Sequence, residues 1–221
     1  TVFRGDPDIE CLNAMGVDSA TVGNHEFDFG QDNFRRLRER AAFPFLSANI
    51  VEKGNGRPLC RSCLTIPIQE GLSLTVIGIT TEELLTVTLP SNVAALDVVE
   101  PVASLQRIYG ELRSRGPVVL LSHCEQRTDR RIAEALPDLT AVIGGHDHIL
   151  LSPYRRVGDV PIFQAFEKGR YLGRIDLLID PAARRAALTG WAYIPITAAM
   201  ESDPQIASIV ASYQEKLGSR F

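Results

Sequence analysis

The chain has 221 residues, of which 45% are hydrophobic and 23% are charged, a composition that fits neither a disordered nor a membrane-spanning protein. Its formal net charge of −4 gives no electrostatic reason to expect nucleic acid as a partner, and no apolar run reaches the roughly 18 residues needed to cross a bilayer. We therefore expect a globular protein with no nucleic-acid and no membrane partner, and the composition leaves its oligomeric state open.

Five helices are predicted from the spacing of apolar residues and from capping signals, over residues 6–15, 32–42, 97–112, 128–136 and 203–217. Asp6 is expected to cap the first helix, whose buried stripe contains Ile9, Leu12 and Met15. The third helix is expected to begin with a capping box in which Asp97 is the cap. Four arginines of the second helix are interpreted as a solvated face rather than a phosphate-binding patch, namely Arg35, Arg36, Arg38 and Arg40.

Predicted strands alternate with these helices, over residues 17–22, 45–51, 72–80, 118–121 and 140–143. The run over 72–80 is almost continuously apolar, which is typical of a strand covered on both faces. Three more strands are expected in succession between residues 160 and 196. Strands that alternate with helices and then follow one another predict an α/β fold with an added antiparallel part, folded as one domain.

The four cysteines give no strong metal or disulfide signal. Cys60 and Cys63 form a C-x-x-C pair, but a second pair that would complete a structural zinc site is missing from the sequence. Their segment is predicted to be extended, and residues three apart on a strand face opposite sides. We therefore expect neither a disulfide nor a shared metal there. Cys11 is expected to be a core thiol, and Cys124 directly follows a histidine.

All four histidines follow predicted strands. His25 comes after the strand over 17–22, His123 ends an apolar run, and His146 and His148 come after the next one. In open α/β sheets, ligands bind at the carboxyl ends of the strands. Imidazole is the commonest metal ligand among side chains and titrates near neutral pH. This placement predicts a metal-dependent active site at one edge of the sheet.

The segment His146-Asp147-His148 has two imidazoles two residues apart. In an extended loop both would project to the same side, so each could bind a different member of a metal pair. Gly144 and Gly145 before them allow a sharp turn and close approach to a ligand. The alternative interpretation is a surface turn that happens to carry two histidines.

Asn24, His25 and Asp28 form a second group of polar residues with a chemical use. The Asn24 carbonyl is a neutral oxygen ligand suited to Mn²⁺, Mg²⁺ or Zn²⁺. His25 and Asp28 are three residues apart, so that in one turn the carboxylate can hold the imidazole and raise its pKa. A cationic imidazole could stabilise a phosphoryl transition state or protonate a leaving oxygen. A turn followed by helix-capping acids is the competing interpretation.

Six segments of the chain, taken together, resemble the catalytic domain of the 5′-nucleotidase family of calcineurin-like metallophosphoesterases: GNHEFDFG, FPFLSANI, VIGITT, LLSH, GGHDH and QAFEKGRYLGRIDL. The resemblance implies a four-layer α-β-β-α sandwich and a cofactor of two divalent metal ions (Mn, Zn or Mg). It implies hydrolysis of phosphoric esters by a metal-activated water, with nucleoside 5′-monophosphates or related nucleotides as the small-molecule substrate. It also implies a periplasmic or extracellular location.

Residue by residue, the resemblance assigns Asn24, His123 and His146 to one metal and His148 to the other. It assigns His25 and Asp28 to the family's catalytic dyad. We expect no covalent enzyme intermediate in such a reaction.

Two motifs of the family have no counterpart in this sequence: a D-x-H segment and a G-D segment, whose residues would complete the two-metal site. We therefore expect residues 1–221 to form an incomplete catalytic domain that lacks the first strand of the sandwich and ends in a linker-like helix over 203–217. A partial site should bind metal weakly, prefer Zn²⁺ to Mn²⁺ and hydrolyse esters slowly. Glu125 stands where the family often has glycine, and Glu167-Lys168 interrupts a usually aromatic turn.

Three alternatives to a 5′-nucleotidase remain open from the sequence. Two are enzymes: a cyclic-nucleotide phosphodiesterase, and a sulfur-oxidation relative with a thioester-like substrate. The third is a degenerate binding domain that has kept the fold and lost the metals.

Overall fold

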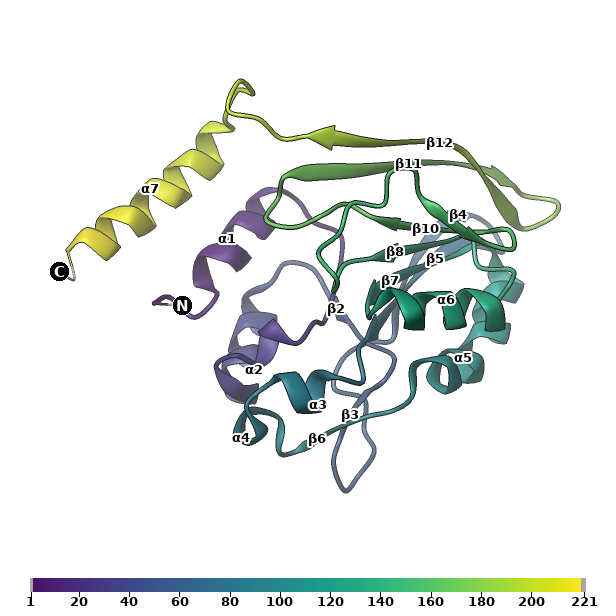
Figure 1. The fold of residues 1–221 in the computed structure, drawn as a ribbon, viewed down its shortest axis with the longest axis horizontal. Coiled ribbons are helices and arrows are strands. Elements are labelled where there is room, and N and C mark those ends of the chain that lie inside the picture. Colours follow the sequence, from purple (N-terminus) through teal and green to yellow (C-terminus); the bar gives the residue numbers. More distant parts are fainter. Residues whose placement is uncertain (1, 220–221) are drawn as a thin grey trace.

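The computed structural model describes residues 2–219 and has the mixed α/β architecture that the alternating pattern predicts (Figure 1). The helices are α1 (Asp6–Ala14), η1 (His25–Phe27, a 3-10 helix), α2 (Gly30–Arg40), α3 (Leu84–Val87), α4 (Pro90–Val93), α5 (Pro101–Arg115), α6 (Gln126–Ala135) and α7 (Pro204–Gly218). The strands are β1 (Ala20–Thr21), β2 (Phe45–Leu46), β3 (Ile50–Glu52), β4 (Cys63–Gln69), β5 (Leu72–Thr80), β6 (Leu96–Val98), β7 (Val118–His123), β8 (Ala141–Gly144), β9 (Arg155–Val157), β10 (Val160–Gln164), β11 (Tyr171–Asp180) and β12 (Arg185–Pro195).

A six-stranded sheet in the order β4-β5-β7-β8-β10-β9 forms the centre of the fold. Its four inner strands are parallel, and the two edge strands run antiparallel to their neighbours. The register pairs Thr80 at the end of β5 with His123 at the end of β7, and β8 ends beside β7. The carboxyl ends of these strands therefore meet at one edge, where the sequence predicts the site.

Helices α5 and α6 cover one face of this sheet, and the main hydrophobic core lies between these helices and the sheet. Ile77, Leu105, Leu120 and Ile132 are fully buried there. On the opposite face β1 and β2 pack against β5 so closely that a Cβ at Gly78 would lie 2.4 Å from a backbone oxygen of β2. Because β5 is covered on both sides, its almost unbroken apolar sequence is explained, and its predicted bounds are confirmed.

A second, aromatic core lies under α2. The Phe34 ring makes a tilted contact with Phe27 and an edge-to-face contact with Phe45, with ring centroids 5.2 and 5.4 Å apart. All three rings are buried. The packing of Phe27 beneath α2 anchors η1, the short helix that carries His25. This core therefore fixes one wall of the predicted site.

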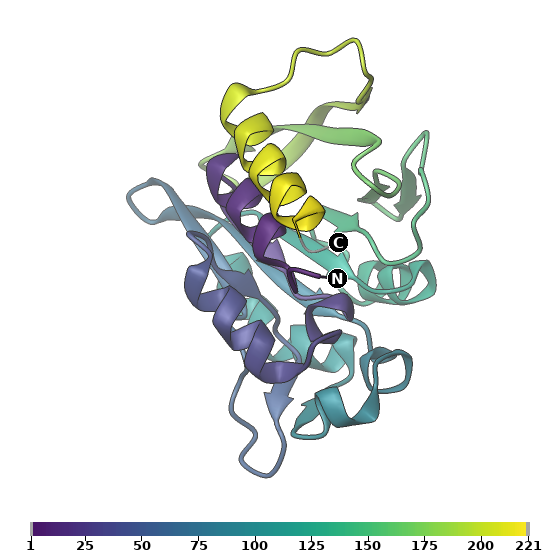
Figure 2. The ribbon, with the colours of Figure 1, turned by 90° about the vertical axis from the view of Figure 1, so that its left-hand side faces the viewer.

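The C-terminal part adds the hairpin β11–β12 and the helix α7, which lies beside α1 in both ribbon views (Figure 2). Asp203 caps α7 by accepting hydrogen bonds from the backbone N–H groups of Gln205 and Ile206 at 2.9 and 3.0 Å, so the predicted start of this helix is confirmed. Among residues 2–219, the helices include none long and apolar enough to cross a membrane.

The predicted cap of the first helix is wrong. Gly5 occupies the N-cap position, and Asp6 makes no side-chain capping bond. Its carboxylate instead forms ion pairs with Arg36 and Arg40 of α2. The interhelical ion pairs thus use the carboxylate that local sequence alone assigned to capping, and they engage Arg36 and Arg40 of the second helix.

Two more local predictions are wrong. Met15 is 60% exposed because α1 ends at Ala14, before the last residue of the predicted stripe. Asp97 lies in the middle of β6, and α5 begins later, where Glu100 accepts a 2.7 Å hydrogen bond from the N–H of Ala103. Pairing of β6 with β3 outweighs the capping-box pattern there.

All four cysteines are free thiols, as expected for Cys60 and Cys63. These two belong to different hydrophobic clusters, in line with the opposite orientation predicted for an extended segment. Cys11 is only half-buried, so the prediction of a core thiol is wrong, whereas Cys124 is 2% exposed.

Candidate metal centre

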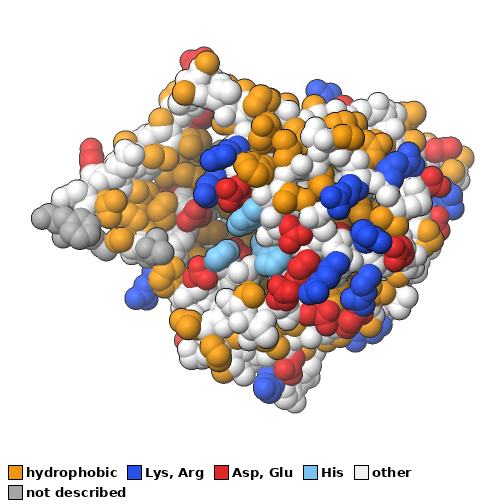
Figure 3. Space-filling model, viewed as in Figure 1, with side chains coloured by type: hydrophobic (Ala, Val, Ile, Leu, Met, Phe, Trp, Pro, Cys, Tyr) orange, Lys and Arg blue, Asp and Glu red, His pale blue; other side chains and the backbone are white. Residues whose placement is uncertain are grey.

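Three of the polar segments singled out in the sequence come together at the carboxyl edge of the central sheet. His123 is the last residue of β7, His146 follows β8 by two residues, and Asn24 follows the short strand β1. Figure 3 shows the histidine side chains gathered near the middle of one face, among acidic and basic side chains.

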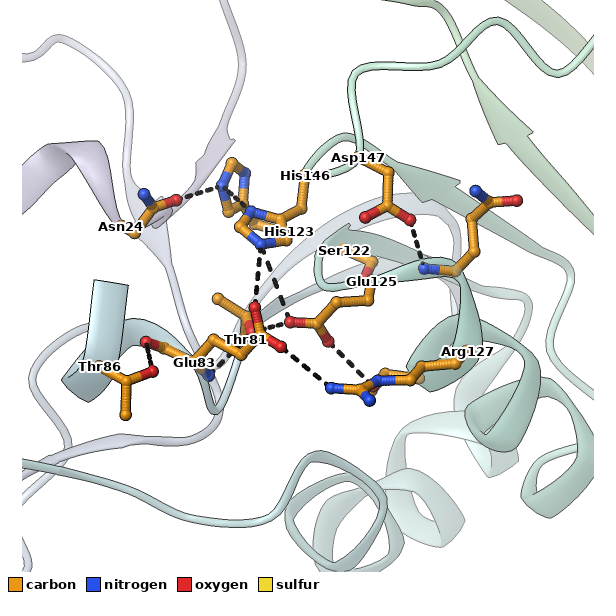
Figure 4. Close-up of polar contacts among 12 residues, drawn as sticks. Asn24, Thr81, Glu83, Thr86, Ser122, His123, Glu125, Arg127, His146 and Asp147 are labelled. Carbon is orange, nitrogen blue, oxygen red and sulfur yellow. Dashed lines mark hydrogen bonds and ion pairs between the residues drawn. The ribbon is translucent and has the colours of Figure 1, made fainter. Parts of the chain in front are cut away.

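Asn24, His123 and His146 point at one another (Figure 4). Nε2 of His123 lies 2.9 Å from Oδ1 of Asn24 and 3.3 Å from Nδ1 of His146. Gly23 permits this approach, because a Cβ at that position would lie 2.8 Å from the His123 ring. One oxygen and two nitrogens therefore converge, and this donor set suits a divalent transition-metal ion.

Burial, followed by positive charge on the neighbouring His146, His25 and His148, lowers the pKa of His123 to about 4. At neutral pH the imidazole is therefore uncharged. A neutral imidazole is the form that binds a metal, so the electrostatics of this position fit a cation ligand.

The contact predicted between His25 and Asp28 is present. Nδ1 of His25 lies 3.0 and 3.3 Å from the two carboxylate oxygens of Asp28. Their side chains are 69% and 48% exposed, in contrast to His123, which is partly buried. Glu26 between them turns inward, where it accepts a 2.6 Å hydrogen bond from the N–H of Gly23 and burial raises its pKa. The pair is thus held on a short helix and open to solvent.

His148 sits apart from the convergent group in its contacts. Its Nδ1 lies 3.3 Å from Oε2 of Glu167, and its side chain is 55% exposed. The extended loop predicted for residues 146–148 is wrong: the chain turns there, closed by a bond from the His148 N–H to the Gly145 carbonyl, and His148 has a φ of 54°. Its charge still acts on His123.

Two glutamates that the sequence did not assign to the site lie beside His146. Nε2 of His146 is 3.8 Å from a carboxylate oxygen of Glu83 and 3.8 Å from one of Glu125. Together the three residues offer ligand atoms within 4.8 Å of one another. Glu83 follows β5 and Glu125 follows β7, so the rule that led to the histidines would also have found them.

Both carboxylates are held by neighbouring side chains. Glu125 accepts hydrogen bonds from the hydroxyls of Thr81 at 2.5 Å and Thr128 at 3.1 Å, and Glu83 accepts one from Arg127 at 3.0 Å. Partial burial raises the pKa of Glu125, but these hydrogen bonds and the positive charge of His146 outweigh it and leave the pKa below its usual value. Glu125 therefore carries a negative charge at neutral pH.

Comparison with known proteins agrees with this geometry. No protein-family model matches the chain. It is 28% identical over 203 residues to a 5′-nucleotidase of Vibrio cholerae, an alignment that covers 77% of this chain and 36% of the relative. It is 25% identical over 183 residues to the uncharacterized metallophosphoesterase YunD of Bacillus subtilis, with coverage of 81% and 39%.

Among solved structures, the sulfate thiohydrolase SoxB of Thermus thermophilus superposes with a TM-score of 0.85 at 24% identity, covering 99% of this chain and 40% of that protein. At this identity the match shows the fold alone. The chain spans well under half the length of each of these three proteins. The order of its motifs, the fold and the names of the curated relatives all support the resemblance to the 5′-nucleotidase family of calcineurin-like metallophosphoesterases.

Proposed function

We propose that this domain hydrolyses phosphoric esters with the aid of divalent metal ions, and that nucleoside 5′-monophosphates are its leading substrates. The observation that carries the proposal is the convergence of Asn24 Oδ1, His123 Nε2 and His146 Nδ1 within 2.9 and 3.3 Å contacts at the carboxyl edge of the sheet. The names of the curated relatives, a 5′-nucleotidase and a metallophosphoesterase, support the same reaction class.

In this proposal Asn24, His123 and His146 hold one cation, and His148 contributes to a second. A bound divalent ion supplies Lewis acidity at the phosphoryl group and lowers the pKa of water that contacts it. Asn24 and the two imidazoles would be neutral metal ligands, so they would leave the positive charge of the ion available to an anionic substrate. This property suits a phosphate ester.

His25 and Asp28 act on the substrate rather than on the metal. The contact of Nδ1 with the Asp28 carboxylate fixes the orientation of the imidazole. The exposed ring can then donate a hydrogen bond to a phosphoryl oxygen, or deliver a proton to the leaving oxygen. Both roles need access to substrate, which the 69% exposure of His25 provides.

We further propose that residues 1–221 are the metal-binding catalytic domain of a larger active unit, with α7 as its linker-like end, and that the unit works in the periplasm or outside the cell. The greater length of the relatives supports the first part, and the family resemblance supports the second. The domain on its own should therefore turn over slowly.

The test is phosphate release from 5′-AMP and from 4-nitrophenyl phosphate by the purified protein, with Zn²⁺ or Mn²⁺ added and then removed by a chelator. We expect slow release that disappears with the chelator and returns with metal, and that is absent in His123→Ala. Release that persists without metal would contradict the proposal. Tight zinc binding without any release would favour a non-catalytic binding domain instead.

A further inference from the structure

The imidazole of His146 lies between two different environments. Its Nδ1 faces Nε2 of His123 at 3.3 Å, and its Nε2 faces carboxylate oxygens of Glu83 and Glu125, each at 3.8 Å. The side chain is 17% exposed, so water screens these contacts only in part. A neutral imidazole carries one proton on one of these two nitrogens, and only the other nitrogen can bind a metal.

We propose that Glu83 and Glu125 are positioning residues that hold the proton of His146 on Nε2 and so present the Nδ1 lone pair to the cation. The inference rests on the proposed function, because it concerns a ligand of the same site. It goes beyond the family pattern, since glycine is common in the family where this chain has Glu125.

The electrostatic potential on the Nε2 side favours a proton there. A distance of 3.8 Å is longer than a hydrogen bond, but two carboxylate oxygens at that range create a negative potential that favours an N–H over a lone pair. Both carboxylates are held in place by other donors: Glu125 by Thr81 and Thr128, and Glu83 by Arg127. They are therefore fixed features of the site rather than freely moving surface charges.

The hydrogen-bond partners on the Nδ1 side favour the same tautomer. Nε2 of His123 faces Oδ1 of Asn24, an acceptor, at 2.9 Å. A proton on Nε2 of His123 would donate to this acceptor in the metal-free protein, and a proton on Nδ1 of His146, only 3.3 Å away, would then face that N–H. Both neighbours of His146 thus favour a proton on Nε2.

The arrangement also explains how a ligand set without an anion can hold a cation. Asn24, His123 and His146 bring no negative charge, whereas the two carboxylates lie on the far side of the His146 ring. Carboxylates that hold the second nitrogen of a metal-bound histidine raise its basicity, and their loss typically costs about 10–100-fold in metal affinity. A direct role as ligands is the competing possibility, because Glu83, Glu125 and His146 also cluster closely enough to hold an ion themselves.

The test reads the tautomer without metal or turnover. Long-range ¹H–¹⁵N NMR of the metal-free protein in mildly alkaline buffer is expected to show His146 mainly protonated on Nε2. In Glu83→Gln/Glu125→Gln a mixture of tautomers should appear, with smaller shifts in each single variant, which also serve if the double variant folds poorly. Glu134→Gln is the matched control, because this exposed glutamate lies on α6 and pairs with Arg130. An unchanged His146 tautomer in all three site variants would overturn the proposal.

Zinc titration by calorimetry supplies the second readout. We expect the double variant to bind Zn²⁺ about 10–100-fold more weakly, and Glu134→Gln to bind like the wild type. Zinc binding that survives Asn24→Ala and His123→Ala but is abolished in the double variant would overturn the proposal, because the ion would then sit on the carboxylates. If the tautomer shifts as expected but no ester is hydrolysed, the proposed function fails and the positioning role stands.

Discussion

The site has two halves that differ in burial. Asn24, His123 and His146 form the buried half, and His25 and Asp28 form the exposed half. His123 lies inside, where burial lowers its pKa to about 4 and keeps it neutral. His25 lies outside, 69% exposed and in contact with the Asp28 carboxylate. A neutral nitrogen suits a metal ligand, whereas a solvent-accessible imidazole beside a carboxylate suits proton donation. The same side chain is thus assigned two roles by its surroundings.

The largest expected effect comes from the exposed half. In the larger active unit, replacing His25 by Asn should lower kcat for 5′-AMP by roughly 10²–10⁴-fold, as for loss of a general acid, while zinc content measured by elemental analysis stays unchanged. The loss should be smaller for 4-nitrophenyl phosphate, whose leaving group needs no proton. Parallel loss of zinc and activity would show that His25 is a ligand, and the distinction between the two halves would fail.

The buried half should give the opposite result. His123→Ala removes the nitrogen that lies between Asn24 and His146, and we expect zinc affinity to fall by more than about 100-fold, beyond the range seen for outer-shell changes. Calorimetric zinc titration measures this effect. His25→Asn is the matched control, because it removes a histidine that is expected not to bind zinc. Equal zinc affinities in the two variants would contradict the division of roles.

A third prediction concerns the carboxyl beneath the buried half. Asp129 on α6 is 1% exposed and accepts a 2.5 Å hydrogen bond from the Ser122 hydroxyl. Burial is the main cause that raises its pKa from 3.8 to about 7; the Ser122 hydrogen bond opposes the rise, and the charges of Asp147 and Glu125 contribute to it. The folded protein therefore binds a proton here that the unfolded chain releases near pH 4.

The folded state holds a proton on Asp129 that the unfolded state loses more easily. The free energy of unfolding that Asp129 contributes is therefore fully present below about pH 4 and is lost as the pH rises to about 7. In Asp129→Asn this loss should vanish, so between pH 4 and 7 the variant gains on the order of 3–4 kcal/mol relative to the wild type. Urea unfolding across this range measures the difference. Asp159→Asn, at a 97% exposed side chain, is the control, and parallel pH profiles of Asp129→Asn and wild type would refute the prediction.

The features that could be predicted from the sequence are those that depend on neighbouring residues. The apolar run of β5 and the cap at Asp203 were found with their bounds, because both burial on two faces and capping leave a mark on neighbouring residues. The contact of His25 with Asp28 followed from spacing within one turn. The roles of these residues remain predictions.

What the sequence missed depends on partners far along the chain. Asp6 forms ion pairs with arginines about 30 residues away instead of capping its helix, and Asp97 lies in a strand instead of starting a helix. Glu83 and Glu125 are 42 residues apart and meet only because β5 and β7 are neighbours in the sheet. The position of each glutamate after a strand indicates the carboxyl edge of the sheet, but nothing local to either residue indicates that the two meet.

The smallest expected effect tests how tightly the buried half is packed. Gly23 has a backbone angle that other residues adopt, but a Cβ there would lie 2.8 Å from the His123 ring. Gly23→Ala should therefore push the ring out of line and cost about 1–3 kcal/mol, as for overpacking in a core. Zinc affinity should fall with it, since His123 would no longer face both Asn24 and His146.

Gly110→Ala provides the matched control for that substitution. Gly110 lies within α5, and a Cβ there would meet nothing within 4 Å, so alanine should leave stability unchanged or raise it by up to about 1 kcal/mol. Thermal unfolding and zinc titration of both variants measure the contrast. A Gly23→Ala protein that unfolds and binds zinc like the wild type would mean that the His123 ring has room to move, and that the buried half is not held as rigidly as its contacts indicate.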